Sequence, residues 1–246
     1  MTRRRWIATE FDEETATLSG DQANHLIRVL RAEPGMRADV VAGERVFQAV
    51  IEHVAEASVR FRLEQEVARD DSLPVELLLA IFKFDRMEWA IEKAVELGAG
   101  TIVPVIARRT EKHLAQAATA RVDRWRRIAL EAAKQSRSSS VPEIAAPCHL
   151  SEALATRRSA DRLRIVLSEH EKIMTLTRCI ANVKPGQEKL SLATGPEGGW
   201  SSEEVALFSE SGWTAASLGP RILRAETAAI ASLALVSGLL GKPSFR

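Results

Sequence analysis

The stretch Val75-Glu-Leu-Leu-Leu-Ala-Ile-Phe82 decides the fold class, because it is an almost uninterrupted apolar run of strand length. Strands buried on both faces of a parallel sheet have this composition, whereas half-solvated strands alternate apolar and polar residues. More apolar segments of similar length follow, each leading into a loop and a helical pattern, at residues 101–106, 163–167, 189–194 and 214–218. Alternating strands and helices predict an α/β domain with a mostly parallel sheet.

The helical patterns between these strands each carry an apolar face. A helix is expected at 86–97, where Gly98 ends it, with Met87, Ile91, Ala94 and Val95 on its buried face. A second is expected near 118–135, burying Val122, Trp125, Ile128, Ala129 and Ala132. The last, 227–240, is apolar nearly all round, which predicts that it is buried or forms a subunit interface.

The first seventy or so residues have a different rhythm. Short β segments are expected at 40–43, 45–51 and 59–64, with one helical pattern that starts at Ser19 or Asp21 and ends at Pro34-Gly35. Many short strands and one helix predict a small β-barrel-like module. The acidic segment Arg69-Asp-Asp-Ser-Leu-Pro74 is interpreted as the linker, so we expect domains at 1–72 and 73–246.

Composition excludes several classes of protein. Hydrophobic residues make up 46% and charged residues 27% of the 246 residues, which is ordinary for a soluble globular chain. The longest apolar stretch is shorter than the roughly 20 residues that span a bilayer, and acids at 10–14 interrupt what begins like a secretory signal. Cys148, Cys179 and the histidines show no metal-ligand spacing. We therefore expect a cytoplasmic protein without a membrane or metal partner.

Charge is unevenly distributed around a net charge of +1. Residues 1–72 hold ten basic and fourteen acidic residues, whereas the segment 101–137 holds nine basic and three acidic ones. Most basic residues are arginines, whose planar guanidinium suits phosphates and base edges. This bias also arises from a GC-rich genome, so composition alone does not decide for a nucleic-acid partner.

The loop Thr194-Gly-Pro-Glu-Gly-Gly-Trp200 follows a predicted strand, at the edge of the sheet where α/β proteins bind ligands. Its glycines let the backbone come close to a ligand, although a tight turn that binds nothing is an equal alternative. The loop matches neither glycine-rich phosphate-binding pattern, and an acid at Glu197 disfavours a phosphate. A ligand with a positive centre or a neutral nucleoside is favoured. Ser201-Ser-Glu-Glu204 predicts a capping box at the start of the next helix.

A second loop, Ser217–Thr227, leads into the apolar last helix. Arg221 and Arg224 precede that helix, where the positive end of the helix dipole disfavours cations. They are therefore expected to bind an anion, to pair with Glu226 or to serve catalysis.

Together these segments resemble a known family. Gly195-Pro-Glu-Gly-Gly199 followed by Leu218-Gly-Pro-Arg-Ile-Leu-Arg-Ala-Glu-Thr-Ala228 is similar to the signature pair of the SPOUT methyltransferases. More narrowly it resembles the RsmE family, which methylates N3 of a uridine in 16S ribosomal RNA with S-adenosylmethionine. Further segments resemble the family in the same order along the whole chain, at 23–31, 83–98, 131–136 and 141–144.

The resemblance implies a trefoil knot in the C-terminal domain, a PUA-like N-terminal RNA-binding barrel and a homodimer. It implies S-adenosylmethionine as cofactor and 16S ribosomal RNA or the small ribosomal subunit as partner. The implied cofactor contacts are Leu167, Thr194, Gly195, Glu197, Gly198, Gly199, Leu218, Gly219, Arg221, Ile222 and Leu223.

Catalytic roles follow from the chemistry that the resemblance implies. N3 of uracil carries a proton at neutral pH, so the site must supply a base or a cation where the uracil oxyanion develops. Arg224 is our candidate for the cation, and Glu197 is a weaker candidate for the base.

The expected RNA contacts fall into two groups. In the N-terminal module they are Arg5, Asn24, His25, Arg28 and Arg31, with Arg28 and Arg31 one helical turn apart. In the basic segment they are Arg109, Arg124, Arg127, Gln135 and Arg137. Each group has an ordinary alternative, a packing histidine or a solvated charged face.

Two positions depart from the family pattern in the basic segment. Ser138 stands where the family usually has an arginine, with Arg137 one place early, and Arg108-Arg-Thr110 stands where Glu-Arg-Ser is common. Alternative functions are a SPOUT methyltransferase for another RNA position and a non-catalytic ribosome-assembly factor. A nucleotide hydrolase is disfavoured, because the loops lack the lysine and metal ligands that it needs.

Overall fold

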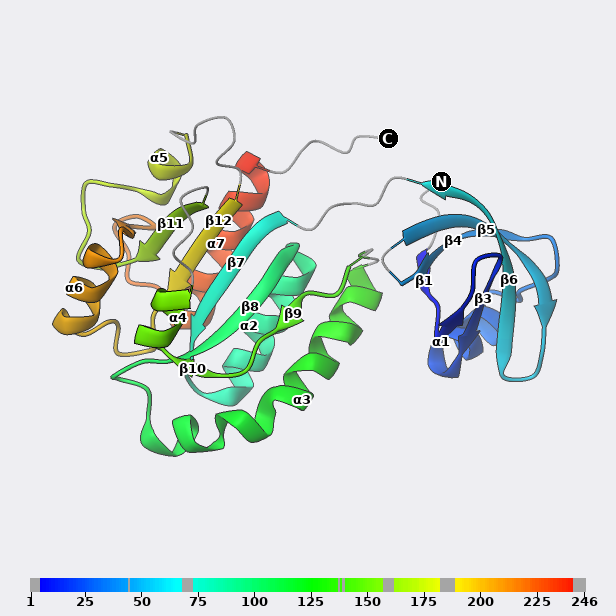
Figure 1. Cartoon of the computed structure of the whole chain (residues 1–246), viewed down its shortest axis with the longest axis horizontal. Helices are drawn as coiled ribbons and strands as arrows, with labels where there is room; N and C mark the ends of the chain where they lie inside the picture. Colours follow the sequence, from blue (N-terminus) through cyan, green and yellow to red (C-terminus); the bar gives the residue numbers. More distant parts are fainter. Residues whose placement is uncertain are drawn as a thin grey trace. The chain divides into compact units, whose positions relative to one another are not determined.

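The computed structural model describes residues 5–43, 45–67, 73–136, 138, 140–156, 162–181 and 189–240 (Figure 1). The chain divides into two compact units. The N-terminal unit comprises Met1–Asp71 with Ala133–Ser140, and the C-terminal unit comprises Ser72–Ala132 with Val141–Arg246.

The N-terminal unit contains a six-stranded sheet in the order β1-β4-β5-β6-β3-β2. Its strands are β1 (Arg5–Ile7), β2 (Glu10–Phe11), β3 (Thr15–Ser19), β4 (Arg37–Ala42), β5 (Arg45–Val54) and β6 (Ser58–Val67). Between β1 and β2, the Ala8 N–H donates to the Val41 carbonyl, and the Thr9 N–H donates to the Thr17 carbonyl. The short segment that joins the two end strands therefore also bonds to their neighbours β4 and β3, so the sheet closes around an apolar core that includes Trp6, Leu18, Val40 and Phe61.

The predicted helix of this unit forms, but its geometry differs from the prediction. An α-helical turn, α1 (Gly20–Asn24), continues as a π-helix, η1 (His25–Val29), and Arg31 beyond it has a φ of 51°. The expectation that Arg28 and Arg31 lie one helical turn apart is wrong, because the helix ends before Arg31 and the left-handed backbone turns the chain away. A sequence pattern gives no warning of the wider π turn.

The C-terminal unit contains a parallel sheet, as predicted. Its strands are β7 (Leu73–Ala80), β8 (Ala99–Ile106), β9 (Glu143–Ile144), β10 (Cys148–His149), β11 (Arg162–Leu167), β12 (Lys189–Thr194) and β13 (Thr214–Ala216). The order is β10-β8-β7-β12-β11-β13, β9 pairs with β8, and every pairing is parallel. Leu77, Leu78 and Leu79 of β7 are fully buried, as the apolar run of that strand requires.

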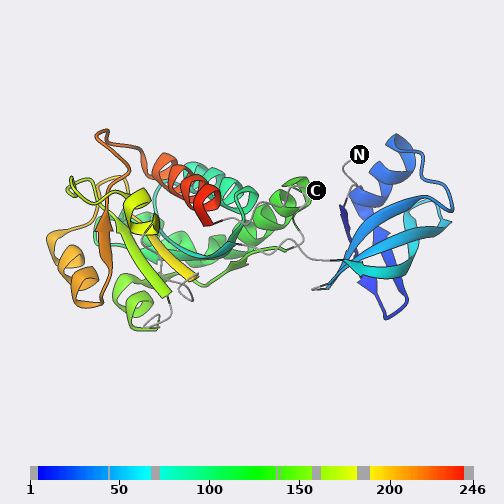
Figure 2. The same ribbon diagram turned by 90° about the horizontal axis from the view of Figure 1, so that it is seen from above.

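Helices cover both faces of this sheet (Figures 1 and 2). They are α2 (Phe84–Glu96), α3 (Lys112–Ser136), α4 (Leu150–Thr156), α5 (Leu176–Ala181), α6 (Ser202–Glu210) and α7 (Ala225–Leu240). Figure 2 shows α2 and α7 side by side on one face. The predicted apolar faces of α2 and α3 are buried apart from Ile128, which is half-buried, and α3 begins six residues before the predicted start at 118.

Helix α7 is buried on one side only. Ala229, Leu233 and Val236 are fully buried, whereas Leu235 and Leu239 are 37% and 52% exposed. The described part of α7 therefore leaves an apolar strip outside the core of its own unit.

Candidate active site

The two predicted glycine-rich loops meet at one cavity of about 380 Å³ in the C-terminal unit. Because β7, β11, β12 and β13 run parallel, their carboxyl ends lie at one edge of the sheet, where the following loops converge. The predicted cofactor residues that line the cavity are Leu167, Gly195, Glu197, Gly199, Leu218, Gly219, Arg221, Ile222 and Leu223, and the catalytic candidate Arg224 joins them. Thr194 and Gly198 do not line it.

The first loop is held in a tight turn. The Gly199 N–H donates to the Pro196 carbonyl, and Gly199 has a φ of 69°, a conformation that favours glycine. A Cβ on Gly195 would lie 3.2 Å from Nε1 of Trp200. Trp200 is fixed in turn by edge-to-face packing on Phe208, with ring centroids 4.9 Å apart. Packing of α6 therefore sets the far end of the loop.

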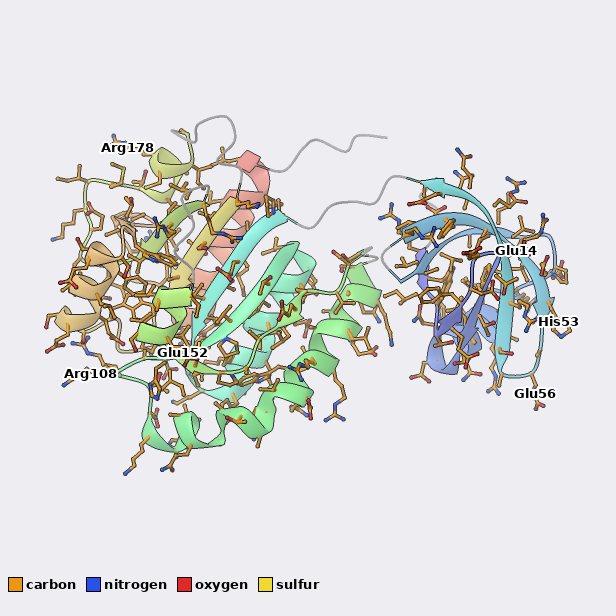
Figure 3. All side chains as sticks on the ribbon, in the orientation of Figure 1. Glu14, His53, Glu56, Arg108, Glu152 and Arg178 are labelled. Atoms are coloured by element: carbon orange, nitrogen blue, oxygen red, sulfur yellow. The ribbon has the colours of Figure 1, made fainter. Side chains whose placement is uncertain are left out.

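Polar contacts anchor the same loop from its other side. The predicted capping box at α6 forms, since the Glu204 N–H donates to Ser201 Oγ and the Ser201 N–H donates to Glu204 Oε2. Glu204 Oε1 also accepts the N–H of Arg108, which Figure 3 labels near the start of α3. Arg109 donates from Nη1 to the Gly198 carbonyl, so Gly198 lies against Arg109 and away from the cavity.

The second loop leaves its charged and apolar side chains open to solvent. Ser217 Oγ accepts the Gly219 N–H at 2.9 Å, which fixes the turn in which Gly219 has a φ of 121°. Beyond it, Arg224 is exposed and Ile222 is 82% exposed. Exposed side chains at the mouth of a cavity are available to a second molecule.

A cationic residue that the sequence did not identify also lines the cavity. Arg86, in the first turn of α2, places Nη1 2.8 Å from Oε1 of Glu197 and Nε 3.9 Å from Oε1 of Glu226. Glu226 is 5% exposed, and its Oε2 has no hydrogen-bond partner within the described part of the chain. The available signal was a cation at a helix N-terminus, where the helix dipole disfavours it.

Ser168, Glu169 and His170 were also missed. They follow β11 directly, at the same edge of the sheet as the two glycine-rich loops. Glu169 places Oε1 3.3 Å from the position of a Cβ on Gly199, so its carboxylate lies beside the first loop. The available signal was the position of these three polar residues, directly after the apolar strand that ends at Leu167.

The cavity fits a nucleoside-type ligand with a positive centre. Leu167, Leu218 and Leu223 supply apolar surface, while the glycines expose backbone donors and acceptors at close range. The carboxylates of Glu169 and Glu197 suit hydroxyl or ammonium groups. The indole N–H of Trp200, buried and without a partner among the described residues, remains to be satisfied. No described cluster of His, Cys, Asp or Glu would hold a metal ion.

The expected RNA contacts lie in both units. Arg5, Asn24, His25 and Arg28 belong to the N-terminal unit, where the His25 ring lies 6.1 Å from that of Trp6. Arg124 and Arg127 are exposed on α3, and Gln135 lies near its end. Arg124 is bound to Glu88 by contacts of 2.6 and 2.8 Å, which raise the Arg124 pKa. Arg137 lies outside the described residues.

None of the helices within the described ranges combines the length and apolar character that a membrane span requires. A parallel sheet with a cavity between loops at its carboxyl edge is typical of α/β enzymes and cofactor-binding proteins, and comparison with known proteins gives the class. A family model described as an RNA methyltransferase domain matches residues 69–237.

The chain belongs to the family of ribosomal RNA small subunit methyltransferase E, which confirms the resemblance found in the sequence. The relative of that name from Synechocystis sp. is 33% identical over 243 residues, covering 98% of this chain and 78% of the relative. The relative from Bacillus subtilis is 29% identical over 231 residues, covering 91% of this chain and 90% of the relative.

Solved structures agree with this assignment. A ribosomal RNA small subunit methyltransferase E from Neisseria gonorrhoeae, bound to S-adenosyl methionine, is 27% identical with a TM-score of 0.78, covering 96% of this chain and 98% of that one. A protein from Legionella pneumophila, solved in complex with the bound cofactor SAM, is 30% identical with a TM-score of 0.76, covering 97% of this chain and 98% of that one. The α/β fold with a parallel sheet is thus shared.

Proposed function

We propose that this protein transfers a methyl group from S-adenosylmethionine to N3 of a uridine in 16S ribosomal RNA. The observation that carries the proposal is the cavity built by the two glycine-rich loops, in a chain whose structural relatives are described with S-adenosylmethionine bound. Acting on ribosomal RNA of the small subunit follows from the family name, and the uracil N3 position follows from the resemblance of the two loop sequences.

In this proposal the bound cofactor supplies an electrophilic methyl group. The backbone of residues 195–199 and 218–219 would hold the adenosine part, and Leu167, Ile222 and Leu223 would supply apolar surface beside it. Arg224 lies at the open side of the cavity and stabilises the uracil oxyanion that forms as N3 loses its proton. Glu197 is the candidate base, although the 2.8 Å contact with Arg86 must open before its carboxylate accepts that proton.

We further propose a trefoil knot through the two loops, a PUA-like N-terminal domain over 1–72, a methyltransferase domain over 73–246 and a homodimer. The insertion of β12 between β7 and β11, late in the chain, and the packing of α7 on α2 support the knot. The closed sheet of the N-terminal unit supports the PUA-like domain, and the exposed apolar strip of α7 supports the dimer. We also propose a cytoplasmic location, which the proposed ribosomal RNA substrate supports.

Arg127 and Arg124 are expected to contribute unequally to RNA binding. Each arginine that contacts a phosphate contributes about 0.7–0.9 to the steepness of the plot of log affinity against log salt, depending on the form of the nucleic acid. Replacing such an arginine by a neutral residue removes this contribution. Arg127→Gln should lower the slope by about this amount, while Arg124→Gln should lower it by less than half as much, because Glu88 already neutralises Arg124. Filter binding to small-subunit RNA over a salt series measures both, and equal slopes for Arg127→Gln and the unmodified protein would contradict the phosphate contact.

Two other functions remain in competition with this one. A methyltransferase for another RNA position would use the same cavity but leave a different methylated nucleoside. A non-catalytic ribosome-assembly factor would bind small-subunit RNA without transferring a methyl group. The intact glycine-rich loops and the cavity at their junction favour an enzyme.

The deciding experiment is mass spectrometry of nucleosides from small-subunit ribosomal RNA, with and without the gene. We expect N3-methyluridine to disappear in the deletion strain and to return with the intact gene but not with Gly199→Ala. Disappearance of a different methylated nucleoside would establish the first alternative. An unchanged nucleoside profile would exclude both methyltransferase assignments.

A further inference from the structure

Arg86 lines the cavity, and neither the motifs nor the proposed chemistry explains its role. It belongs to α2, whereas its two carboxylate partners come from the loop after β12 and from the first turn of α7. One guanidinium therefore joins three segments that are far apart in the sequence. Arg86 lines the cavity together with residues of both glycine-rich loops.

Electrostatics makes this arrangement costly unless all three groups are present. A cation in the first turn of a helix is disfavoured by the helix dipole, so α2 alone does not favour an arginine there. Glu226 is 5% exposed, and a buried carboxylate without a counter-charge is strongly unfavourable. Arg86 offsets the charge of Glu226 through Nε, while its Nη1 bonds to Glu197 at 2.8 Å.

Arg86 holds one wall of the cavity through its contact with Glu197. Its side chain is the part of the Gly195–Gly199 loop that bonds to Arg86, and the Gly198 carbonyl on the other side bonds to Arg109. A glycine-rich loop has high conformational freedom when unbound, and binding a ligand must overcome that entropy unless the loop is already held. The Arg86 contact holds it from the α2 side, before any ligand arrives.

We propose that Arg86 is a positioning residue for the cofactor: it fixes Glu197, and through it the glycine-rich loop, in the conformation that binds S-adenosylmethionine. The inference rests on the proposed function only in taking S-adenosylmethionine as the ligand of this cavity. Arg86 acts before the chemical step, so its loss is expected to weaken cofactor affinity, and affinity is the quantity that tests the proposal.

The test compares Arg86→Gln with Arg86→Lys and with Lys93→Gln. Lys93 is a matched control, because it is on the same helix and forms ion pairs with Glu92 and Glu96, away from the cavity. Calorimetry with S-adenosylmethionine should show at least about tenfold weaker binding for Arg86→Gln, or about 1.4 kcal/mol. The affinity of Arg86→Lys should fall between those of Arg86→Gln and the unmodified protein, because a single ammonium does not bridge both carboxylates. Lys93→Gln should bind normally.

A second readout follows the loop without any cofactor. Trp200 lies against Gly195, and its signal in a fluorine spectrum of 5-fluorotryptophan-labelled protein is assigned by Trp200→Phe among the 5 tryptophans. The Trp200 signal should shift or broaden in Arg86→Gln and stay unchanged in Lys93→Gln. If Arg86→Gln does not fold, Arg86→Gln combined with Glu226→Gln removes the buried unpaired charge, and the same loss of affinity is expected.

Two results would overturn the proposal. Unchanged affinity with a lowered melting temperature would make Arg86 purely structural. Unchanged affinity with a lowered kcat on small-subunit particles would place Arg86 against the RNA substrate instead. If the unmodified protein binds S-adenosylmethionine but methylates no ribosomal RNA, the proposed substrate fails, while the affinities still decide the role of Arg86.

Discussion

Gly199→Ala is expected to weaken S-adenosylmethionine binding at least about 100-fold, or roughly 2.7 kcal/mol. Gly199 has a φ of 69°, which costs an alanine about 1–2 kcal/mol. Its Cβ would also lie 3.3 Å from the Glu169 carboxylate, on the wall of the cavity. Moving the loop relieves both strains but displaces the backbone groups proposed to bind the cofactor, so the effect appears in the calorimetric affinity.

Gly212→Ala is the matched control for this change. Gly212 has a φ of 72° in the same unit, so alanine meets the same backbone strain there. Its Cβ would make only an ordinary contact, 3.5 Å from Arg164, and the residue does not line the cavity. Both variants should lose similar stability in urea unfolding, but only Gly199→Ala should lose affinity. Normal cofactor binding by Gly199→Ala would show that this part of the loop does not touch the cofactor.

The cavity loops were predictable from the sequence because their chemistry is local. The glycines at 195, 198 and 199 allow a tight turn, and Ser201 with Glu204 marks a helix start within four residues. The apolar run that begins at Val75 likewise predicts a buried parallel strand without knowledge of its neighbours. Each signal depends on the type and spacing of nearby residues, and each of these features is present in the structure.

The partners of the loops were not predictable, because they depend on strand order. Arg86 reaches Glu197 across more than a hundred positions only because β12 pairs with β7 and brings its loop beside the start of α2. Glu169 enters the cavity for the same reason, through the pairing of β11 with β12. The π-helix at His25–Val29 escaped prediction differently, since apolar spacing does not distinguish a π turn from an α turn over so few residues.

Arg224→Gln is expected to lower kcat at least about 100-fold, which is typical for the loss of one donor to a developing oxyanion. Affinity for S-adenosylmethionine should stay within about threefold of normal, because Arg224 is exposed and forms no ion pair within the described ranges. A nearby cation lowers the pKa of uracil N3, so removing it should also move the rising limb of the pH–rate profile to higher pH. Single-turnover methylation of small-subunit particles from a deletion strain measures both effects.

Arg178→Gln is the control, since Arg178 is an exposed arginine of α5 whose Nη1 donates to the Ile173 carbonyl, and it does not line the cavity (Figure 3). Its turnover and pH profile should be unchanged. Normal turnover by Arg224→Gln would exclude Arg224 as the cation. A joint fall of kcat and cofactor affinity would instead assign Arg224 to holding the second loop. Of the arginines that line the cavity, Arg86 is expected to alter cofactor affinity and Arg224 is expected to alter turnover, so the two variants separate binding from chemistry.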